Sequence, residues 1–465
     1  MKFKSYLVCG FATTLNVILY ALTGGRFLWL EGRVRGGVFS NWGKRFRYRP
    51  KRFVQPRTEE EIVEIVREAK ELRLFGSAHS FNPGVVADDT LVSLDNYSGV
   101  IDRQDLGDRQ MAFKGGTRIR DVAKLLLDAG LAFSSLPSHD AQSIGGILST
   151  DVHGTGRDWG FVSQLVVKLK VIDGEGNVKE CVPSDELFKA AIGGIGAAGI
   201  ISEVVVQAVD RFNVEQKVEL SNLSFVRNNF DSLFAANEHL SLYLFPFTDR
   251  CQINTWNYTK RKKSFLGTLR EFLSISVDAL LSAWAGNLMA YTGLLPRLST
   301  FAHSIRRGTN LVLESNKAYN RTIYHFHQEL EYTVPFEDTF EACRQCIELY
   351  ENMYREGLPY SIFEIRFTPA GHDTTLIGAG RERRSTWIDI VICDSTGFER
   401  YYAAVEELMK RIGARPHLGK FCQSFGKEEM AKLHQQNFNR FLEIRERQDP
   451  HRKFINDFTR RLFGD

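Results

Sequence analysis

The chain has 465 residues, of which 43% are hydrophobic and 25% charged, the balance of an ordinary folded protein. Its length favours two domains over a single hydrophobic core. The net charge is only +4, with lysines and arginines scattered among acidic residues, which argues against nucleic acid as a partner. The seven cysteines are dispersed and odd in number, so we expect no disulfide framework. Cys343 and Cys346 form a CxxC pair without a second pair, and we predict no metal site.

The amino terminus is apolar. Lys2 and Lys4 precede an uncharged stretch, residues 5–25, which is long enough at helical rise to cross or nearly cross a bilayer. The stretch fits a signal sequence, an uncleaved anchor or a buried helix, and residues 21–23 form a weak cleavage pattern. We expect residues 1–40 to associate the protein with a membrane, or to be removed if the protein is secreted.

The next segment predicts a β-α-β unit. Pro50 and Pro56 keep residues 41–55 extended, and Thr58 with Glu61 has the spacing of a capping box at a helix start. Residues 72–82 then read as a strand that ends in small polar residues around His79. Consecutive backbone N–H groups in such a turn bind anions. By itself the stretch fits either a phosphate-binding loop or a surface turn.

A second segment, residues 136–156, is rich in glycines and hydroxyl groups. We expect a loop that holds backbone close to a ligand, although cap and turn glycines explain the same pattern. Residues 165–173 and 177–182 predict a hairpin. Residues 194–199 match GxGxxG, but a predicted helix precedes them and a predicted strand follows. This context is the reverse of a nucleotide fingerprint, so we predict no nicotinamide-type Rossmann site.

From residue 214 the pattern changes to that of a second domain. Its predicted strands are 214–220, 241–245, 252–258, 329–334, 360–368 and 387–393, and its predicted helices are 225–235, 340–354 and 398–412. Helices on one face of an antiparallel sheet indicate an α+β architecture. A helical insertion covers residues 264–305. Arg270, Glu271 and Asp278 make it a poor membrane span, and we expect a packed helical pair that at most touches a bilayer surface.

Six short motifs, taken in order, resemble the vanillyl-alcohol-oxidase flavoprotein family, in particular its sugar-1,4-lactone oxidase and alditol oxidase branch. They are Tyr48-Arg49-Pro50 with Pro56-Arg57, residues 76–82, Gly145-Gly146 with residues 153–156, residues 196–201, Glu364-Ile365-Arg366, and residues 417–420. The likeness covers about residues 41–458. It implies an α+β, two-domain FAD-binding fold. The FAD-binding domain would be 41–212, the α+β substrate (cap) domain 213–414 with the insertion 264–305, and 415–465 a C-terminal segment that returns to the FAD site.

The resemblance also implies roles for individual residues. His79 stands where this family often joins a histidine covalently to the flavin. The implied cofactor-binding residues are Leu74, Phe75, Gly76, Ser77, Ala78, His79, Ser80, Ser138, Ser143, Gly146, Thr150, Asp151, Val152, His153, Gly154, Ile201 and His417. The implied catalytic residues are Glu364, Arg366, Lys420 and Ser138. Glu364 and Arg366 are two apart on a strand and therefore share a face; without the resemblance they read as a surface salt bridge.

The expected function is FAD-dependent oxidation of a CH–OH group in a sugar, aldonolactone or polyol by hydride transfer to flavin N5, with oxygen as the acceptor. One alternative is a membrane-associated dehydrogenase that acts on a lipid-linked sugar and uses another acceptor. The other is a non-catalytic carbohydrate-binding module. Leu418 stands where the branch usually carries tryptophan, and Pro137 lies near the position that gates oxygen access. The sequence therefore leaves pocket shape and acceptor open.

Overall fold

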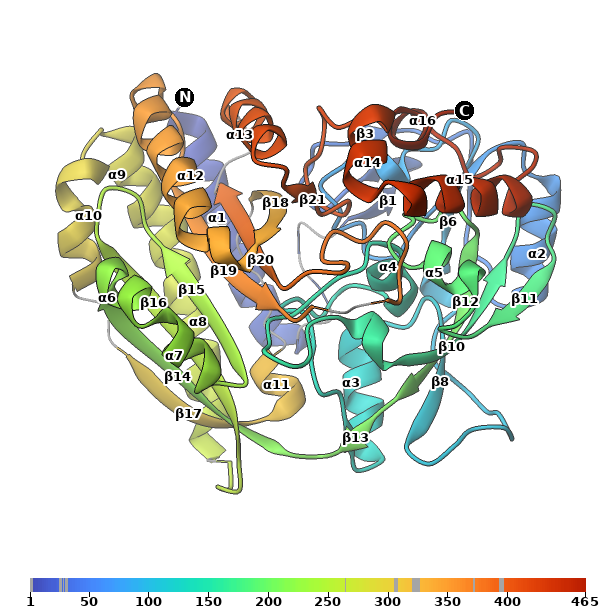
Figure 1. Ribbon diagram of the computed structural model, residues 1–465, viewed down its shortest axis with the longest axis horizontal. Helices are drawn as coiled ribbons and strands as arrows, with labels where there is room; N and C mark the ends of the chain where they lie inside the picture. Colours follow the sequence, from blue (N-terminus) through green and yellow to red (C-terminus); the bar gives the residue numbers. More distant parts are fainter. Residues whose placement is uncertain are drawn as a thin grey trace.

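The computed structural model describes residues 3–24, 27, 29, 32–263, 265–304, 308–319, 327–370, 373–392 and 397–465. Figure 1 shows an eight-stranded sheet with its helices on the left of the view and the smaller sheets on the right. The chain crosses from right to left near residue 210, at the strand β13 (Val209–Asp210). The last helices return to the right-hand half.

The first small sheet is parallel. Its strands β4 (Arg52–Val54), β6 (Thr90–Ser93) and β5 (Leu72–Phe75) lie in that order. The helix α2 (Glu59–Glu68) connects β4 to β5 and starts after Thr58, whose hydroxyl accepts a hydrogen bond from the Glu61 N–H at 3.2 Å. The predicted helix start and the strand before His79 are confirmed. A short antiparallel sheet, β1 (Arg33–Arg35), β2 (Val38–Ser40) and β3 (Arg47–Tyr48), precedes this unit.

The five-stranded sheet is antiparallel, in the order β11-β10-β12-β8-β7. Its strands are β7 (Val100–Ile101), β8 (Gln110–Lys114), β10 (Val166–Ile172), β11 (Val178–Cys181) and β12 (Ile200–Gln207). Strands β10 and β11 form the predicted hairpin. The helices α3 (Ile119–Asp128) and α5 (Glu186–Ala191) also belong to this half, and β9 (Leu131–Ala132) pairs with β13.

The glycine-rich segment 136–156, which we expected to be rich in loop, also contains a helix, α4 (Ile144–Ser149). Ser143 caps it by accepting a hydrogen bond from the Gly146 N–H at 3.3 Å. Gly145 and Gly146 have low helix propensity, and for this reason the pattern favoured a loop. The helix forms because Ile144, Ile147 and Leu148 are buried against the five-stranded sheet.

The large sheet is antiparallel throughout, in the order β17-β14-β16-β15-β19-β20-β18-β21. Its strands are β14 (Asn213–Asn222), β15 (His239–Leu244), β16 (Arg250–Thr259), β17 (Thr309–Glu314), β18 (Gln328–Pro335), β19 (Ser361–Thr368), β20 (Ser385–Ile392) and β21 (Arg415–Pro416). One face packs into the largest hydrophobic core, with α12 (Thr339–Met353) and α13 (Glu399–Arg411). The other face carries polar side chains. The predicted helix 225–235 is two helices, α6 (Leu223–Asn228) and α7 (Phe230–Ala235), which meet at Asn229.

The insertion is one long helix followed by a shorter one. Helix α8 (Phe265–Leu281) continues through a π-helical turn (Ser282–Gly286) into α9 (Asn287–Tyr291), and α10 (Leu295–Ser304) follows. The amino-terminal helix α1 (Phe3–Thr23) packs along α8 and α9. Two segments, Lys4–Thr23 and Phe272–Tyr291, are long and apolar enough to cross a membrane by length and composition. The second begins after Arg270 and Glu271 and contains one charged residue, Asp278.

The carboxyl-terminal segment returns to the first half of the chain. It forms α14 (Lys427–His434), α15 (Gln436–Gln448) and α16 (Asp457–Phe463), and α11 (Ser315–Tyr319) is the remaining helix. The Leu72 N–H donates a hydrogen bond to the Lys453 carbonyl at 2.8 Å. Strand β5, which leads to His79, is thus held by residues close to the end of the chain.

Candidate active site

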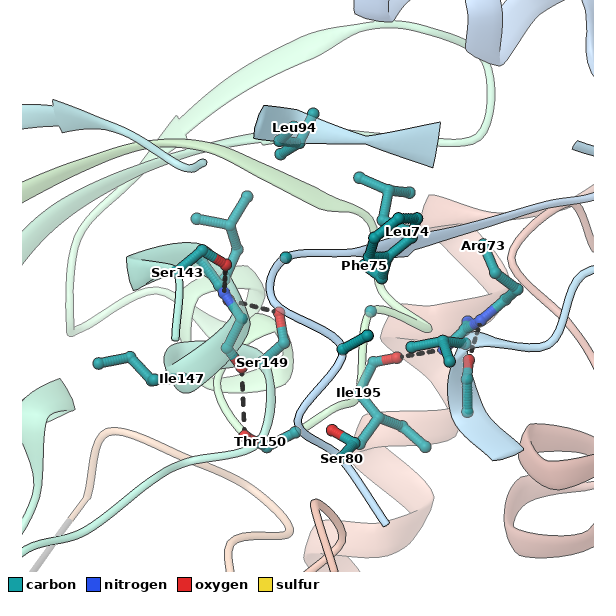
Figure 2. Close-up of a pocket in the computed structure, with 18 of the residues that line it drawn as sticks. Arg73, Leu74, Phe75, Ser80, Leu94, Ser143, Ile147, Ser149, Thr150 and Ile195 are labelled. Carbon is teal, nitrogen blue, oxygen red and sulfur yellow. Dashed lines mark hydrogen bonds between the residues drawn. The ribbon is translucent and has the colours of Figure 1, made fainter. Parts of the chain in front are cut away.

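A cavity with seven glycines among its lining residues lies between the end of β5 and helix α4 (Figure 2). We call it the glycine-lined cavity. Its empty space is about 1020 Å³, part of it open to solvent, which is enough for a large cofactor. It is lined by residues 72–80 on one side, by Ser143, Gly146 and Thr150 on another, and by Ile195, Gly196 and Ile201 on a third.

The loop after β5 needs its small residues. A Cβ at Gly76 would lie 2.1 Å from Oγ of Ser143, so a larger residue would push α4 away or fill the cavity. Ala78 has φ 54°, in the left-handed region that non-glycine residues rarely adopt. Such a turn directs successive N–H groups to one side, the arrangement that binds phosphate oxygens without a charged side chain.

Arg73 puts a buried cation in the wall of the same cavity. Its guanidinium donates to the carbonyl oxygens of Gly84 (2.6 Å), Phe454 (2.6 Å) and Ile195 (2.7 Å), and Figure 2 shows it opposite Ser143. Burial lowers the pKa of Arg73 to about 10. The group therefore stays charged at neutral pH and favours an anionic ligand beside it.

A second cavity adjoins the first and is lined by histidines, carboxylates and cations. We call it the histidine-lined cavity. His79, Ser80, Gln142 and Thr150 line both cavities, so the two are neighbours. Nε2 of His139 lies 3.0 Å from Nδ1 of His79. Burial lowers the pKa of His79 well below its usual value and that of His139 to about 3, so both rings are neutral nucleophiles or hydrogen-bonding groups at neutral pH.

One ion-pair network crosses the polar face of the large sheet. Nη2 of Arg366 (β19) donates to Glu331 (β18) at 2.7 Å and to Asp389 (β20) at 3.2 Å. Nε2 of His153 lies 3.1 Å from the same oxygen of Glu331, while its Nδ1 lies 2.8 Å from the Gly154 carbonyl. A carbonyl only accepts, so Nδ1 must carry a hydrogen. The contact between Nε2 and Glu331 then needs one further proton, shared by these two groups.

A second network lies beside it. Nζ of Lys420 donates to Glu329, and Nε2 of His327 lies 3.3 Å from the other oxygen of that carboxylate. Burial opposes charge on both members of the pair, but their attraction outweighs it. The pKa of Glu329 is therefore lowered and that of Lys420 raised. Both remain ionised at neutral pH.

Asp389 differs from the two glutamates. Its burial, together with the charges of Glu329 and Glu331, raises its pKa well above the usual value, against the opposing effect of Lys420 and Arg366. Asp389 therefore keeps its proton to a higher pH than an ordinary aspartate does. Glu329 and Glu331 face the cations Arg366 and Lys420, and this pairing lowers the cost of burying the cluster.

A third, smaller cavity lies against the polar face of β19. We call it the cap-side cavity, after the expected cap domain. Ser138 and Arg366 line both this cavity and the histidine-lined one, whereas Glu364 lines only the cap-side cavity. Glu364 and Arg366 share the polar face of β19, as predicted. Glu364 lies opposite Asp389 in the sheet and is half-buried. A ligand that reaches from His79 to Glu364 would therefore pass Ser138 and Arg366.

The structure brings nearly all predicted site residues to these three cavities. The predicted residues that line the glycine-lined cavity are Leu74, Phe75, Gly76, Ser77, Ala78, His79, Ser80, Ser143, Gly146, Thr150 and Ile201. The histidine-lined cavity is lined by the predicted residues Ser138, Val152, His153, Arg366, His417 and Lys420. The cap-side cavity is lined by Gly154 and Glu364. Asp151 does not line any of them. Its carboxylate accepts a hydrogen bond from Ser163 at 2.8 Å and faces Gly378, so its role in binding the cofactor stays a prediction.

Several residues were not predicted. They are Trp42, Arg73, His139, Gln142, His327, Glu329, Glu331 and Asp389. A signal was present for two of them, because Glu329 and Glu331 alternate with Leu330 and Tyr332 along a strand and so share a face. Asp389 lies between isoleucines, and only the pairing of β18 with β20 places it opposite Glu331.

His153, Glu331 and His417 also have ligand atoms within 4.8 Å of one another, a spacing that could hold a metal ion. Arg366 donates to the same carboxylate at 2.7 Å, and a second cation there would be repelled. The absence of a metal stays a prediction.

The fold and the cavity beside His79 define a flavin-dependent oxidoreductase. A family model described as an FAD-binding domain matches residues 50–182, the part of the chain that holds the loop after β5 and α4. A model of the D-arabinono-1,4-lactone oxidase family matches residues 204–462, more than half of the chain. The chain belongs to this family, and the predicted α+β FAD-binding fold of the vanillyl-alcohol-oxidase type is confirmed.

Two relatives can be aligned with most of this chain, and a third with about half of it. The chain is 26% identical over 433 residues to L-gulono-1,4-lactone dehydrogenase of Mycobacterium tuberculosis, covering 92% of this chain and 99% of the relative. It is 25% identical over 448 residues to L-gulonolactone oxidase of Bos taurus, with the same coverage. It is 34% identical over 229 residues to D-arabinono-1,4-lactone oxidase of Candida glabrata, covering 47% of this chain and 44% of that one. A crystal structure of cholesterol oxidase from Brevibacterium sterolicum has a TM-score of 0.72 at 16% identity, covering 92% and 96% of the two chains, and shares the fold.

The residues present fit FAD. The wall of the glycine-lined cavity offers backbone N–H groups and the Arg73 cation to a pyrophosphate. Gln142 lines both cavities, and its buried Oε1 has no hydrogen-bond partner among the described residues, so it can accept from a ring N–H. The cofactor is FAD, and the enzyme is an FAD-dependent oxidoreductase.

Proposed function

We propose that the protein oxidises a CH–OH group of an aldonolactone, with related sugars and polyols as further substrates. The observation that carries this proposal is that Arg366 and Lys420 line the histidine-lined cavity. This cavity adjoins the glycine-lined cavity at His79, which lines both. The relatives named as lactone oxidases and dehydrogenases support the substrate class. We also propose that residues 41–212 bind FAD, residues 213–414 form the cap, and residues 415–465 complete the FAD site.

Bound FAD would accept a hydride equivalent from the carbon that carries the hydroxyl group. We propose that Ser138, Arg366 and Glu364 hold the lactone ring and its hydroxyls, because these three side chains line one continuous path away from His79. Arg366 and Lys420 are fixed cations, since their paired carboxylates keep them ionised. They therefore stabilise negative charge that develops near them and do not act as bases.

The hydroxyl proton must leave as the C–H electron pair leaves. Glu329 is an ionised carboxylate on the cavity wall, and we assign it the proton. Its pKa is low, but a carbinol that is losing hydride is turning into a protonated carbonyl, a very strong acid. A weak base is therefore sufficient. The C–H and O–H bonds would break as the carbonyl forms, with Glu329 taking the proton and bound FAD supplying the acceptor for the two electrons.

We propose dioxygen as the electron acceptor and a covalent bond between His79 and FAD. The neutral imidazole of His79, in contact with His139, supports the bond. Acid precipitation tests it: flavin colour should stay in the pellet of the native protein and move to the supernatant with His79→Ala. Oxygen uptake measured beside dye reduction tests the acceptor. Faster turnover with the dye and no oxygen uptake would indicate a dehydrogenase.

The function itself is tested by mixing the yellow protein anaerobically with L-gulono-1,4-lactone, D-arabinono-1,4-lactone and a set of polyols. Bleaching of the flavin band by a lactone is the expected result. A protein that holds FAD but is bleached by none of these compounds would refute the proposal. A colourless protein that still binds sugars would favour a non-catalytic carbohydrate-binding module.

We further propose that the protein associates with a membrane through its amino-terminal segment. The support is the apolar helix α1, which fits an anchor or a signal sequence. Sedimentation of the native protein with the membrane fraction is the expected result.

A further inference from the structure

Exposed apolar side chains are concentrated on one part of the molecule. Among the described residues, 22 large apolar side chains are exposed, and fifteen of them belong to α1 and to α8–α10 with the turns that join them. Five lie on α1: Val8, Phe11, Leu15, Ile18 and Leu22. Ten lie on the insertion: Leu266, Leu269, Leu273, Val277, Leu281, Trp284, Leu288, Tyr291, Leu294 and Leu298. We call these fifteen residues the outer apolar surface. A patch of this kind marks an interaction site.

The exposed residues follow the helical repeat. Successive members on α1 are three or four residues apart, and so are those from Leu266 to Tyr291. Each helix therefore turns one continuous apolar stripe away from the protein. Leu22 is 77% exposed and Phe11 is 64% exposed, values that a helix packed in a core would not show.

The buried sides of these helices are mostly small and polar. On α1 they include Cys9, Gly10, Ala12, Thr13 and Asn16, and on the insertion Ser276, Ala279, Ser282, Ala283, Gly286, Asn287 and Ala290. Tyr6 and Leu295 are large buried exceptions. A helix on the surface of a water-soluble protein has the opposite arrangement, with large apolar groups inside. Small and polar residues at helix contacts with apolar groups outside are typical of proteins in contact with lipid.

The two stripes form one surface because α1 and the long helix of the insertion run antiparallel in contact. The ring centroids of Tyr6 and Tyr291 are 5.4 Å apart, and those of Phe11 and Trp284 are 5.1 Å apart. Nε1 of Trp284 donates to Thr14 Oγ1 at 3.1 Å. A Cβ at Gly10 would lie 2.6 Å from the Trp284 ring, so this contact is close-packed.

Charge beside the patch favours an anionic surface. Lys260, Arg261, Lys262 and Lys263 directly precede α8, and all four are exposed. Arg261 and Lys263 have acidic partners, Glu215 at 2.7 Å and Glu314 at 3.5 Å. No ion pair is found for Lys260 or Lys262 in the part of the chain that the structure describes. Basic residues next to an apolar helix face bind anionic lipid headgroups.

We propose that the outer apolar surface docks in the plane of an anionic phospholipid leaflet, with both helices lying along it and neither crossing it. This inference rests on the proposed membrane association and specifies its geometry. The helices lie flat because their inner sides are fixed to the protein. The Tyr354 hydroxyl donates to the Ala290 carbonyl at 3.1 Å, a Cβ at Gly286 would lie 2.8 Å from Tyr360, and Asn16 accepts from the Trp29 N–H at 2.8 Å.

The test uses the full-length, FAD-loaded protein and sedimentation with two kinds of vesicle. One kind contains phosphatidylcholine alone, and the other also contains phosphatidylglycerol. The variant Leu273→Glu with Val277→Glu places two charges on the outer apolar surface without touching α1. The matched control is Phe225→Glu on α6, because Phe225 is 52% exposed and Leu273 is 50% exposed. Flavin absorbance per protein shows that each variant has folded.

We expect the native protein and the control to sediment with vesicles, more strongly with the anionic ones, and to be released by alkaline carbonate. The double variant should lose at least tenfold in the bound-to-free ratio. If the native protein binds and the double variant binds equally well, α1 alone holds the membrane and the inference fails, while membrane association stands. Resistance to carbonate would indicate a spanning helix and would also overturn it. A native protein that binds no vesicle, but forms a dimer that the double variant abolishes, would assign the surface to a second copy and refute both proposals.

Discussion

Replacing Lys420 by Met tests whether this cation stabilises the reaction or only neutralises a neighbour. The change removes the Nζ that donates to Glu329 and leaves that buried carboxylate with His327 alone. Removing one partner of a buried ion pair costs about 3–5 kcal/mol of stability. Removing a fixed charge that stabilises the transition state slows the chemical step by about 10²–10³. We expect both losses.

The double variant Lys420→Met with Glu329→Gln separates the two effects. Both buried charges are gone, so the free energy of unfolding should return to within about 1 kcal/mol of the native value. Flavin reduction by lactone should stay slow, because the cation and the proposed proton acceptor are both missing. Stability is measured by denaturant unfolding and the rate by anaerobic stopped flow. A double variant that regains the native rate would refute a catalytic role for Lys420.

Three further predictions concern the fold around the site. His434 is buried, and its burial together with nearby arginine charges lowers its pKa to about 3. The ring is therefore neutral in the folded protein, and below about pH 6.5 it binds a proton when the protein unfolds. Stability should fall as the pH drops from about 6.5, and His434→Leu should remove about 2 kcal/mol of that loss at about pH 5. Gly76→Ala should lower the FAD content, and Gly76→Ala with Ser143→Gly should restore it, because the second change removes the Oγ that the new Cβ meets at 2.1 Å. Asp389→Asn should change the free energy of unfolding by less than about 1 kcal/mol, because the raised pKa of Asp389 favours the neutral acid, which asparagine resembles. Glu331→Gln should cost about 3–5 kcal/mol by unpairing Arg366.

Each of these has a clear contrary outcome. Equal acid sensitivity of the native and His434→Leu proteins would mean that His434 is protonated when folded. Full FAD content in Gly76→Ala, read from the ratio of flavin to protein absorbance, would show that the loop does not press on Ser143. Similar losses for Asp389→Asn and Glu331→Gln in denaturant unfolding would show that Asp389 carries a charge.

Local signals predicted most of the first half of the chain. Thr58 and the apolar repeat after it fix α2, and glycines at the turn fix the β10–β11 hairpin. The prediction that a helix precedes residues 194–199 and a strand follows them is also confirmed, since these elements are α5 and β12. The local pattern failed at α4, because two glycines outweigh the Ser143 cap in propensity while burial against the sheet decides the structure.

The site was predicted where its residues form motifs and missed where they meet only through the sheet. Glu364 and Arg366 could be assigned a shared face from their spacing. Glu331 and Asp389 could not be linked, because their contact depends on the register of β18 with β20. His139 meets His79 only because two distant loops are folded together. Pairings of this kind are set by tertiary contacts, which no window of sequence contains.

The hydrogen bonds of Arg73 bear on when the protein can be loaded with its cofactor. This side chain joins the carbonyls of Gly84, Ile195 and Phe454, so one wall of the FAD cavity depends on a residue 381 positions further along the chain than Arg73. A protease cut between Ile195 and Phe454, with loss of the released piece, would remove one of the three acceptors that hold the guanidinium. We expect such a protein to lose flavin colour even though every motif before the cut remains intact.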